Sequence, residues 1–281
     1  MAQTICVCGA GTMGSGIAQN AAQSGLYTIL FDVNTAVLEL AQNSIEHSLQ
    51  ALFEKKKLSV EEIDAIYRRI VFTKDIHQCV GDVIIEAIVE KTEAKIALLN
   101  QLAEINHSDT IFATNTSSLS VTGIASKVIN PQRVIGMHFF NPATIMKLVE
   151  IVTPAFVSPA TKDTIVQLAK EMGKTAVVCN DSPGFIVNRV ARPFYIESLR
   201  LLEQEICPAA TIDKILEASG FRMGPFKLMD LIGNDINYAV SVSVYEQLGQ
   251  PERLKPSYIQ KEKVARGELG KKSGQGYYRY P

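Results

Sequence analysis

Two polar residues interrupt apolar runs, and their types could supply a general base. His138 follows Val134-Ile-Gly-Met137 and precedes Phe139-Phe-Asn-Pro142, a sharp stop that would hold the imidazole at the carboxyl end of a strand. Glu150 interrupts the apolar residues 148–152. A buried carboxylate needs a partner, and a bond to one ring nitrogen of His138 would fix the tautomer and increase the basicity of the other nitrogen. The alternative is an outward-facing Glu150 and a structural turn at His138.

Two further polar clusters could reach the same region. Thr114-Asn115-Thr116-Ser117-Ser118 follows a predicted strand, so its hydroxyls and amide would project into the crevice at the strand ends. Ser117 or Ser118 could equally cap a helix. Asn188 is a polar residue early in an otherwise apolar predicted helix, where it could also be a plain helix residue.

A dinucleotide site is predicted near the start of the chain. An apolar strand ends at Gly9, and Gly9, Gly11 and Gly14 lead directly into a predicted helix. This order allows a tight turn, close approach of a pyrophosphate and close helix packing, with free N–H groups facing the phosphates. A second strand, residues 27–31, ends in Asp32, close to the spacing of about 20 residues expected for the acid that binds the adenosine ribose. Asp32 favours NAD over NADP; the alternative is a strand-end turn residue.

Strands and helices that would position these residues alternate through residues 1–183. Further strands are predicted at residues 70–73, 83–88, 110–114, 134–137, 148–152 and 175–179, and helices at 92–105 and 159–172. A helical pair is inserted after the second strand, the first helix capped by Asn34 and the second opened by the capping box Ser59-Val-Glu-Glu62. This alternation predicts an α/β, Rossmann-like doubly wound domain with a mostly parallel sheet.

An all-α C-terminal domain is predicted for residues 184–281. The turn-rich Asn180-Asp-Ser-Pro-Gly184 marks the boundary, and helices are predicted at residues 185–204, 211–219, 236–248 and 258–266. Pro193 would kink the first of these helices, and Gly224-Pro225 is interpreted as a break. Many apolar positions on these helices predict burial against another subunit, so we expect a homodimer formed through this domain.

The composition excludes several classes of function. The net charge is −1 and the sequence pI is near 6.4, which gives no basic surface for nucleic acid. No apolar run reaches membrane length, so no membrane contact is expected. The five cysteines are scattered without a C-x-x-C pair, so we expect no metal site and a reducing, cytoplasmic compartment. The first strand begins by residue 4, which leaves no room for a signal peptide.

Taken together, the motifs resemble the short-chain L-3-hydroxyacyl-CoA dehydrogenase family, in particular its bacterial 3-hydroxybutyryl-CoA dehydrogenases. The resemblance spans the whole chain. It rests on Gly9-Ala-Gly-Thr-Met-Gly-Ser-Gly16, Glu86-Ala-Ile-Val-Glu90, Asn115-Thr-Ser-Ser118, His138-Phe-Phe-Asn-Pro142, Met146-Lys-Leu-Val-Glu150, Asp181-Ser-Pro-Gly-Phe-Ile-Val-Asn-Arg189, Met223-Gly-Pro225 and Gly270-Lys-Lys-Ser-Gly-Gln-Gly-Tyr-Tyr278.

The resemblance implies NAD-dependent interconversion of a 3-hydroxyacyl-CoA, with short acyl chains such as 3-hydroxybutyryl-CoA, and the 3-ketoacyl-CoA. It implies His138 as general base, Glu150 as its support, and Ser117 and Asn188 as ligands of the substrate oxygens. The cofactor contacts it implies are Gly9, Gly11, Thr12, Met13, Gly14, Asp32, Glu90, Lys95, Asn115, Ser117 and Asn141, and the contacts to CoA are Ser48 and Lys55.

The chain departs from the family at a few positions, and two other functions stay open. Arg192, Lys227 and Asn234 stand where apolar or acidic residues are expected, which leaves the acyl pocket and the subunit contact in question. A dehydrogenase of a free hydroxy or sugar acid such as gulonate would need a carboxylate-binding arginine instead of residues that bind CoA. A crystallin-like, non-catalytic relative would not need an intact His138 and Glu150.

Overall fold

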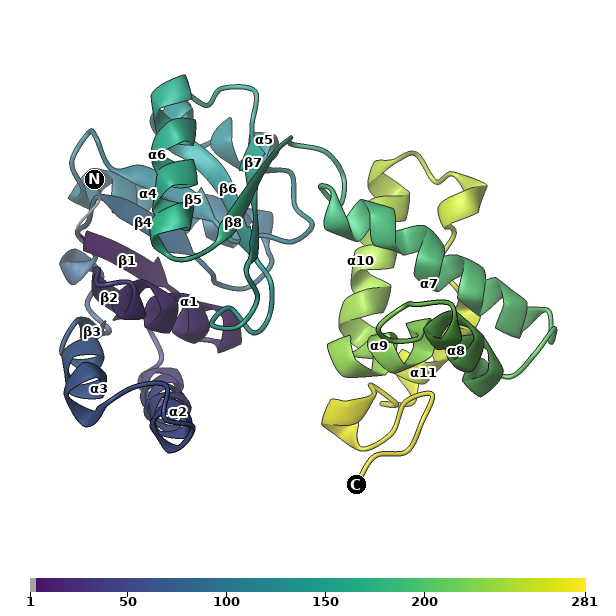
Figure 1. Ribbon diagram of the computed structural model, residues 1–281. Helices are drawn as coiled ribbons and strands as arrows, with labels where there is room; N and C mark the ends of the chain where they lie inside the picture. Colours follow the sequence, from purple (N-terminus) through teal and green to yellow (C-terminus); the bar gives the residue numbers. More distant parts are fainter. Residues whose placement is uncertain (1–3) are drawn as a thin grey trace. The chain divides into compact units, whose positions relative to one another are not determined.

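The computed structural model describes residues 4–281 and divides into two compact units, Met1–Asp181 and Ser182–Pro281 (Figure 1). Residues 1–3 of the predicted first domain lie outside the described residues. None of the helices in residues 4–281 has both the length and the apolar character needed to cross a membrane.

The first unit is organised around one sheet with the order β3-β2-β1-β4-β5-β6-β7-β8 in the described part of the chain. Neighbouring strands are parallel, except that β6 and β7 are antiparallel. Because β1 lies between β2 and β4, the chain order reverses there, which places a ligand crevice at the carboxyl end of β1. The strands are β1 (Thr4–Cys8), β2 (Tyr27–Phe31), β3 (Ile70–Thr73), β4 (Val83–Glu86), β5 (Ile111–Thr114), β6 (Val134–Phe139), β7 (Leu148–Thr153) and β8 (Thr175–Asn180).

Helices pack on both faces of this sheet, so the predicted doubly wound fold is confirmed. Strand β1 shows why: Ile5 and Val7 belong to one buried apolar cluster, and Cys6 and Cys8 belong to the other. Asn34 caps α2, and the capping box at Ser59 is present. The helices are α1 (Thr12–Gln23), α2 (Thr35–Glu54), α3 (Val60–Tyr67), α4 (Thr92–Ile105), α5 (Val121–Ala125) and α6 (Pro159–Glu171); the short α5 was not predicted.

The fold brings together three cysteines that are scattered in the sequence. Cys6 and Cys8 point to the same face of β1 with their Sγ atoms 3.8 Å apart. Cys79, which follows β3, joins them, and the three buried Sγ atoms all lie within 4.8 Å of one another. Three thiols are one ligand fewer than the four of a structural zinc site. The sequence gives no signal for this cluster, because Cys79 reaches Cys6 and Cys8 only through the sheet order.

The second unit is helical, as predicted for the C-terminal domain. Its helices are α7 (Val187–Glu203), α8 (Ala209–Ala218), α9 (Pro225–Ile232), α10 (Asn234–Gln247) and α11 (Tyr258–Ala265). Pro193 lies inside α7. The interpretation of Gly224-Pro225 as a break missed α9, because Gly224 is the N-cap of this helix and Pro225 its first residue, a position that suits proline.

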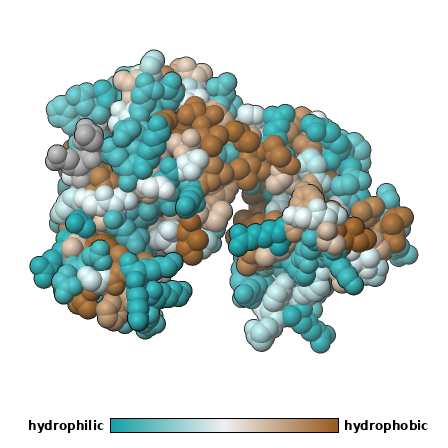
Figure 2. All heavy atoms as spheres, in the orientation of Figure 1, coloured by the Kyte–Doolittle hydropathy of each residue, from teal (hydrophilic) through white to brown (hydrophobic). Residues whose placement is uncertain are grey.

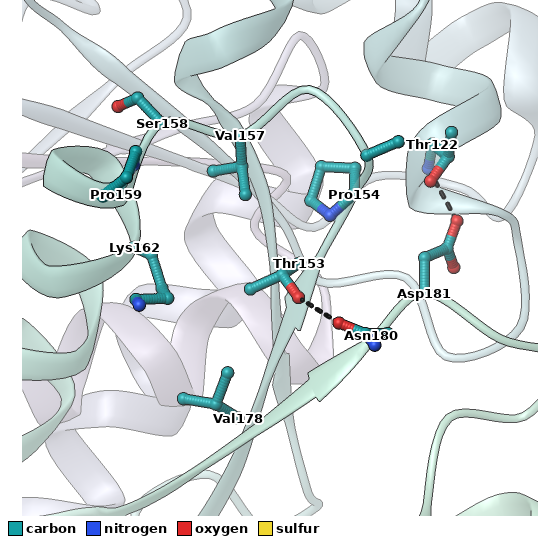
Figure 3. Close-up of a pocket in the computed structure, with 11 residues that line it drawn as sticks. Thr122, Thr153, Pro154, Val157, Ser158, Pro159, Lys162, Val178, Asn180 and Asp181 are labelled. Carbon is teal, nitrogen blue, oxygen red and sulfur yellow. Dashed lines mark hydrogen bonds between the residues drawn. The ribbon is translucent and has the colours of Figure 1, made fainter.

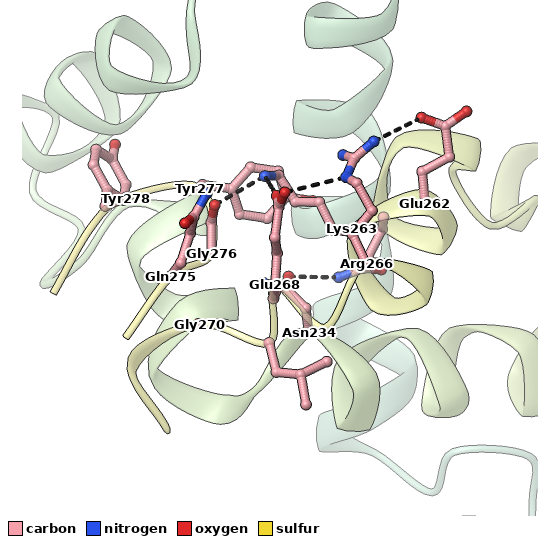
Figure 4. A network of polar contacts seen from close by, with 12 residues as sticks. Asn234, Glu262, Lys263, Arg266, Glu268, Gly270, Gln275, Gly276, Tyr277 and Tyr278 are labelled. Atoms are coloured by element: carbon pink, nitrogen blue, oxygen red, sulfur yellow. Dashed lines mark hydrogen bonds and ion pairs between the residues drawn. The ribbon is translucent and has the colours of Figure 1, made fainter. Parts of the chain in front are cut away.

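Buried polar contacts hold the C-terminal tail against these helices. The Asp230 carboxylate is fully buried and accepts hydrogen bonds from the backbone N–H groups of Tyr277 and Tyr278, both at 2.9 Å. Figure 4 shows a second anchor, in which Lys263 Nζ lies 2.7 Å from a carboxylate oxygen of Glu268 and donates to a carbonyl oxygen of the tail. The tail motif that supports the family resemblance is therefore a structural element of this unit.

Candidate active site

The glycine-rich turn has the geometry of a phosphate site. Gly9 has a φ of 101°, and a Cβ there would lie 2.6 Å from the carbonyl oxygen of Ala87. A Cβ on Gly14 would lie 1.7 Å from the Gly9 carbonyl oxygen, so α1 can pack this close only with glycine. A Cβ on Gly11 would meet no described atom within 4 Å. Gly11 therefore faces open space at the start of α1, where no side chain of the described residues caps the helix.

Asp32 fastens the end of β2 to this turn. Its Oδ2 accepts a hydrogen bond from the backbone N–H of Ala10 at 2.9 Å, and its Oδ1 accepts one from Asn34 at 2.9 Å. A carboxylate has about four lone-pair sites, so both oxygens can still accept from a hydroxyl. The carboxylate is thus fixed beside the glycine turn, where a ribose hydroxyl would lie.

A buried ion-pair cluster follows β4. Lys95 Nζ lies 2.6 Å from Glu86 and 3.2 Å from Glu90, and both Lys95 and Glu86 are almost completely buried. The second Glu86 oxygen accepts from the Thr114 hydroxyl at 2.6 Å. Glu86 was not predicted as a site residue, although its position at the end of a strand was a usable signal. Lys95 therefore acts within this cluster, where it positions Glu90.

Glu90 in turn orders the loop that carries Ser117. Its Oε1 accepts hydrogen bonds from the Thr116 hydroxyl at 2.6 Å and from the Ser117 backbone N–H at 2.9 Å. Burial raises the pKa of Glu90, but the charge of Lys95 and these hydrogen bonds outweigh it, and the pKa is lowered overall. The ionised carboxylate is therefore the form that holds the loop.

Asn115 links the Ser117 loop to the strand that carries His138. Its Oδ1 accepts a hydrogen bond from the backbone N–H of Phe139 at 2.8 Å, and its own backbone N–H donates to the Glu86 carbonyl oxygen at 2.8 Å. The carboxyl ends of β4, β5 and β6 are thus tied together, which fixes Ser117 and His138 on one edge of the sheet.

His138 and Glu150 form a buried hydrogen-bonded pair. They are direct partners in the antiparallel pairing of β6 and β7, and Nδ1 of His138 lies 2.8 Å from Oε2 of Glu150. His138 is 6% exposed and Glu150 is 1% exposed. The bond fixes the ring so that Nδ1 faces the carboxylate and Nε2 is the nitrogen that can exchange a proton with a substrate. The alternative of an outward-facing Glu150 is therefore wrong.

The loop after His138 is held by a lysine that sequence reasoning missed. Lys174, between α6 and β8, is buried and donates to the carbonyl oxygens of Ala143 and Met146, the latter at 3.0 Å. Burial lowers the pKa of Lys174. Asn141, in the same loop, is exposed. Gly11 and Thr12, where α1 begins, are exposed as well.

The residues expected to contact CoA lie on α2. The Ser48 hydroxyl accepts a hydrogen bond from Gln19 Nε2 of α1 at 2.9 Å, so α1 and α2 are tied together at this point. Lys55 is the exposed C-cap of α2. Asn188, in contrast, is the second residue of α7 and belongs to the second unit, where its carbonyl oxygen accepts from Arg192 Nε at 3.0 Å.

Two cavities are lined by other residues. Figure 3 shows the first, of about 610 Å³, where Thr153 bonds Asn180 at the ends of β7 and β8 and Lys162 extends from α6. The second, of about 680 Å³, lies between α2 and α3. Among residues 4–281, none of the predicted site residues lines either cavity. The candidate site is therefore the open edge of the sheet.

These residues fit NAD. The uncapped start of α1 offers backbone N–H groups to a pyrophosphate, the open face of Gly11 admits it, and Asp32 can accept from a ribose hydroxyl. Asp32 would repel a 2′-phosphate, which favours NAD over NADP.

Comparisons with known proteins show the family of the chain. Residues 4–182 match the family model "3-hydroxyacyl-CoA dehydrogenase, NAD binding domain", and residues 184–280 match the C-terminal domain of the same family. The cofactor indicated by the first match is NAD.

Individual relatives extend the match over nearly the whole chain. The chain is 44% identical to a 3-hydroxyadipyl-CoA dehydrogenase of Escherichia coli, over 98% of this chain but only 58% of that protein. It is 39% identical to a probable 3-hydroxybutyryl-CoA dehydrogenase of Bacillus subtilis, over 98% of this chain and 96% of that protein. The crystal structure of an (S)-3-hydroxybutyryl-CoA dehydrogenase from Ralstonia eutropha matches with a TM-score of 0.95 at 34% identity and covers 100% of both chains.

Proposed function

The chain belongs to the 3-hydroxyacyl-CoA dehydrogenase family, and from this premise we propose that it interconverts (S)-3-hydroxyacyl-CoA and 3-ketoacyl-CoA with NAD. The observation that carries the proposal is the buried His138–Glu150 pair at the edge of the sheet where the NAD turn also lies. The sequence resemblance favours a short acyl chain, 3-hydroxybutyryl-CoA. The name of the Escherichia coli relative makes a dicarboxylic acyl chain a second candidate.

His138 acts as the general base in this proposal. Bound NAD supplies the hydride acceptor for oxidation and the hydride donor for reduction. In oxidation, Nε2 of His138 takes the proton of the 3-hydroxyl while the hydride leaves C3, so that a ketone forms. The Glu150 carboxylate stabilises the resulting imidazolium through Nδ1. In reduction, the same nitrogen returns the proton to the oxygen on C3.

The other residues bind and position the substrate and the cofactor. We assign Ser117 and Asn188 to the hydroxyl and thioester oxygens, where their polar groups would stabilise developing charge. Glu90 holds the Ser117 loop, and Lys95 holds Glu90. Ser48 and Lys55 on α2 are assigned to CoA, with the exposed ammonium group near its phosphates.

We also propose that the second unit forms a homodimer. Figure 2 shows apolar surface (brown) among hydrophilic side chains. In the second unit, the large apolar side chains that are more than a third exposed are Ile186, Val190, Ile206, Ile215, Phe221, Leu231, Ile232, Ile236 and Tyr258. Burial of such side chains against a second copy would lower the free energy of the assembly.

All five cysteines are free thiols, which suits a reducing, cytoplasmic compartment.

The experiment that tests the proposed function is consumption of NADH with acetoacetyl-CoA, 3-ketohexanoyl-CoA and 3-ketoadipyl-CoA, with free acetoacetate as the control. We expect turnover of at least one CoA thioester and none of the free acid. Turnover of free acids alone would support the hydroxy-acid alternative. No turnover of any thioester would overturn the proposal.

A further inference from the structure

Arg192 is a buried cation held entirely by neutral partners. It lies on α7, one helical turn beyond Asn188, and is 3% exposed. Its Nε donates to the Asn188 carbonyl oxygen, and its Nη1 donates to the Asn237 carbonyl oxygen at 3.0 Å and to the Ser241 hydroxyl at 2.8 Å. Its guanidinium carbon lies 4.9 Å from the centre of the Tyr195 ring.

The guanidinium lacks a counter-charge within residues 4–281, where no carboxylate forms an ion pair with it. A buried charge without a counter-charge is costly. Burial lowers the pKa of Arg192 to about 10, so the side chain is still a cation at neutral pH. Three of its donors are used, and the two N–H groups of Nη2 make no hydrogen bond to the described residues.

A buried donor without an acceptor belongs to Asn237, whose carbonyl oxygen accepts from Arg192 Nη1. The side chain of Asn237, which is 1% exposed, has an Nδ2 atom with no hydrogen-bond partner among the described residues. Its Oδ1 accepts from Gln260 Nε2 at 3.2 Å, so the amide is fixed. A cation without a counter-charge and a buried N–H donor without an acceptor thus belong to two residues in direct contact, and an anion with several acceptor lone pairs would satisfy both.

We propose that Arg192 binds a carboxylate at the far end of the acyl chain, so that the preferred substrates are CoA thioesters of 3-hydroxy dicarboxylic acids. The inference rests on the proposed function, in which Asn188 contacts an oxygen at the reacting end of that chain. A free carboxylate is the acceptor that an arginine binds best, through two parallel N–H bonds.

The spacing selects a chain of about six carbons. Side chains four residues apart on a helix have Cβ atoms about 5–6 Å apart, which is the separation of Asn188 and Arg192. C3 and C6 of a six-carbon chain are separated by three bonds, about 4 Å, as consecutive Cα atoms are. Nε of Arg192 lies 3.0 Å from the Asn188 carbonyl oxygen, so the guanidinium lies beside Asn188, within the reach we infer for the terminal carboxylate of 3-hydroxyadipyl-CoA. A four-carbon chain ends in a methyl group and leaves the guanidinium without a counter-charge.

Steady-state kinetics test the proposal with two six-carbon substrates that differ in the carboxylate. We expect wild-type protein to reduce 3-ketoadipyl-CoA with a kcat/KM about 100-fold above that for 3-ketohexanoyl-CoA. Arg192→Val should abolish this preference, read as the ratio of the two kcat/KM values within the variant, and Arg192→Lys should retain part of it. Equal values for the two substrates in the wild type, or an equal loss on both in Arg192→Val, would overturn the proposal.

Inhibition of the wild type tests the same point without a substitution in the buried helix. Adipyl-CoA and hexanoyl-CoA lack the 3-oxygen, so neither is turned over. We expect adipyl-CoA to have the lower inhibition constant, and the difference between the two constants to decrease as salt is added. Equal inhibition by the two would contradict the proposal. Turnover of 3-ketohexanoyl-CoA or acetoacetyl-CoA with no preference for the carboxylate defeats this inference alone, whereas no turnover of any thioester defeats the proposed function.

Discussion

Nδ1 of His138 lies 2.8 Å from Oε2 of Glu150, across an antiparallel pair of strands in which the two residues are direct partners. Both side chains are almost completely buried, so the carboxylate acts on the imidazole with little screening by water. The pairing of β6 with β7 is also the one antiparallel step among the described strands. The reversal of β7 therefore brings Glu150 beside His138.

The first prediction concerns this pair. His138→Gln should lower kcat by about 10³-fold with NADH binding unchanged, since a glutamine amide cannot take up the proton. Glu150→Gln should lower kcat by about 10–100-fold, because the imidazolium loses its carboxylate. Initial rates of NADH consumption give kcat, and fluorescence titration with NADH gives the Kd of the cofactor. Glu39→Gln, at an exposed position of α2, is the matched control. Near-normal turnover in His138→Gln would remove His138 from its role.

The second prediction separates two glycines of the turn. Gly11→Ala should leave the melting temperature unchanged, because its Cβ meets no described atom within 4 Å, but it should weaken NADH binding by blocking the pyrophosphate. Gly14→Ala should lower the melting temperature, because its Cβ would overlap the Gly9 carbonyl oxygen. Gly123→Ala in α5, which has room for a methyl group, is the control. Unchanged NADH affinity in Gly11→Ala would place the pyrophosphate elsewhere.

The third prediction concerns the choice of cofactor. Wild-type protein should prefer NADH, and Asp32→Asn should lower the ratio of kcat/KM for NADH to that for NADPH by about tenfold or more. The amide removes the charge that repels a 2′-phosphate, and its oxygen can still accept from the Ala10 N–H. Paired kinetics with both cofactors measure the ratio, with Asp64→Asn on the exposed face of α3 as the control. A wild-type preference for NADPH would contradict this assignment.

The fourth prediction concerns stability at acid pH. The pKa of Glu90 is lowered in the folded state, so its contribution is present above the unfolded pKa of about 4.3 and is lost as the pH falls through the folded value. Glu90→Gln should lower the melting temperature by about 2–4 °C at pH 7, and the difference from wild type should vanish near pH 3. The partial exposure of this side chain keeps the effect small.

Thermal unfolding between pH 3 and pH 8 measures this difference. Glu104→Gln, an exposed acid near the end of the same helix as Lys95, should show no such pH dependence. A constant difference between Glu90→Gln and wild type over the whole range would mean that the ionised carboxylate does not hold the Ser117 loop.

Local patterns in the sequence were sufficient for the architecture and for the choice of candidate residues, whose roles stay predictions. The glycine turn, the strand–helix alternation and the capping residues Asn34 and Ser59 depend on interactions within a few residues, so they can be recognised without knowledge of the fold. The helix that begins at Pro225 was missed because proline ends some helices and begins others.

Relationships between distant residues were decided only by the tertiary structure. Cys79 lies beside Cys6 and Cys8 because β4 pairs with β1. Glu86 forms an ion pair with Lys95 because α4 packs over the end of β4. The lack of a counter-charge for Arg192 depends on every neighbour that surrounds it. The burial of a side chain, its charge balance and its distance from other residues all depend on how the whole chain packs. No local stretch of the sequence therefore contains them.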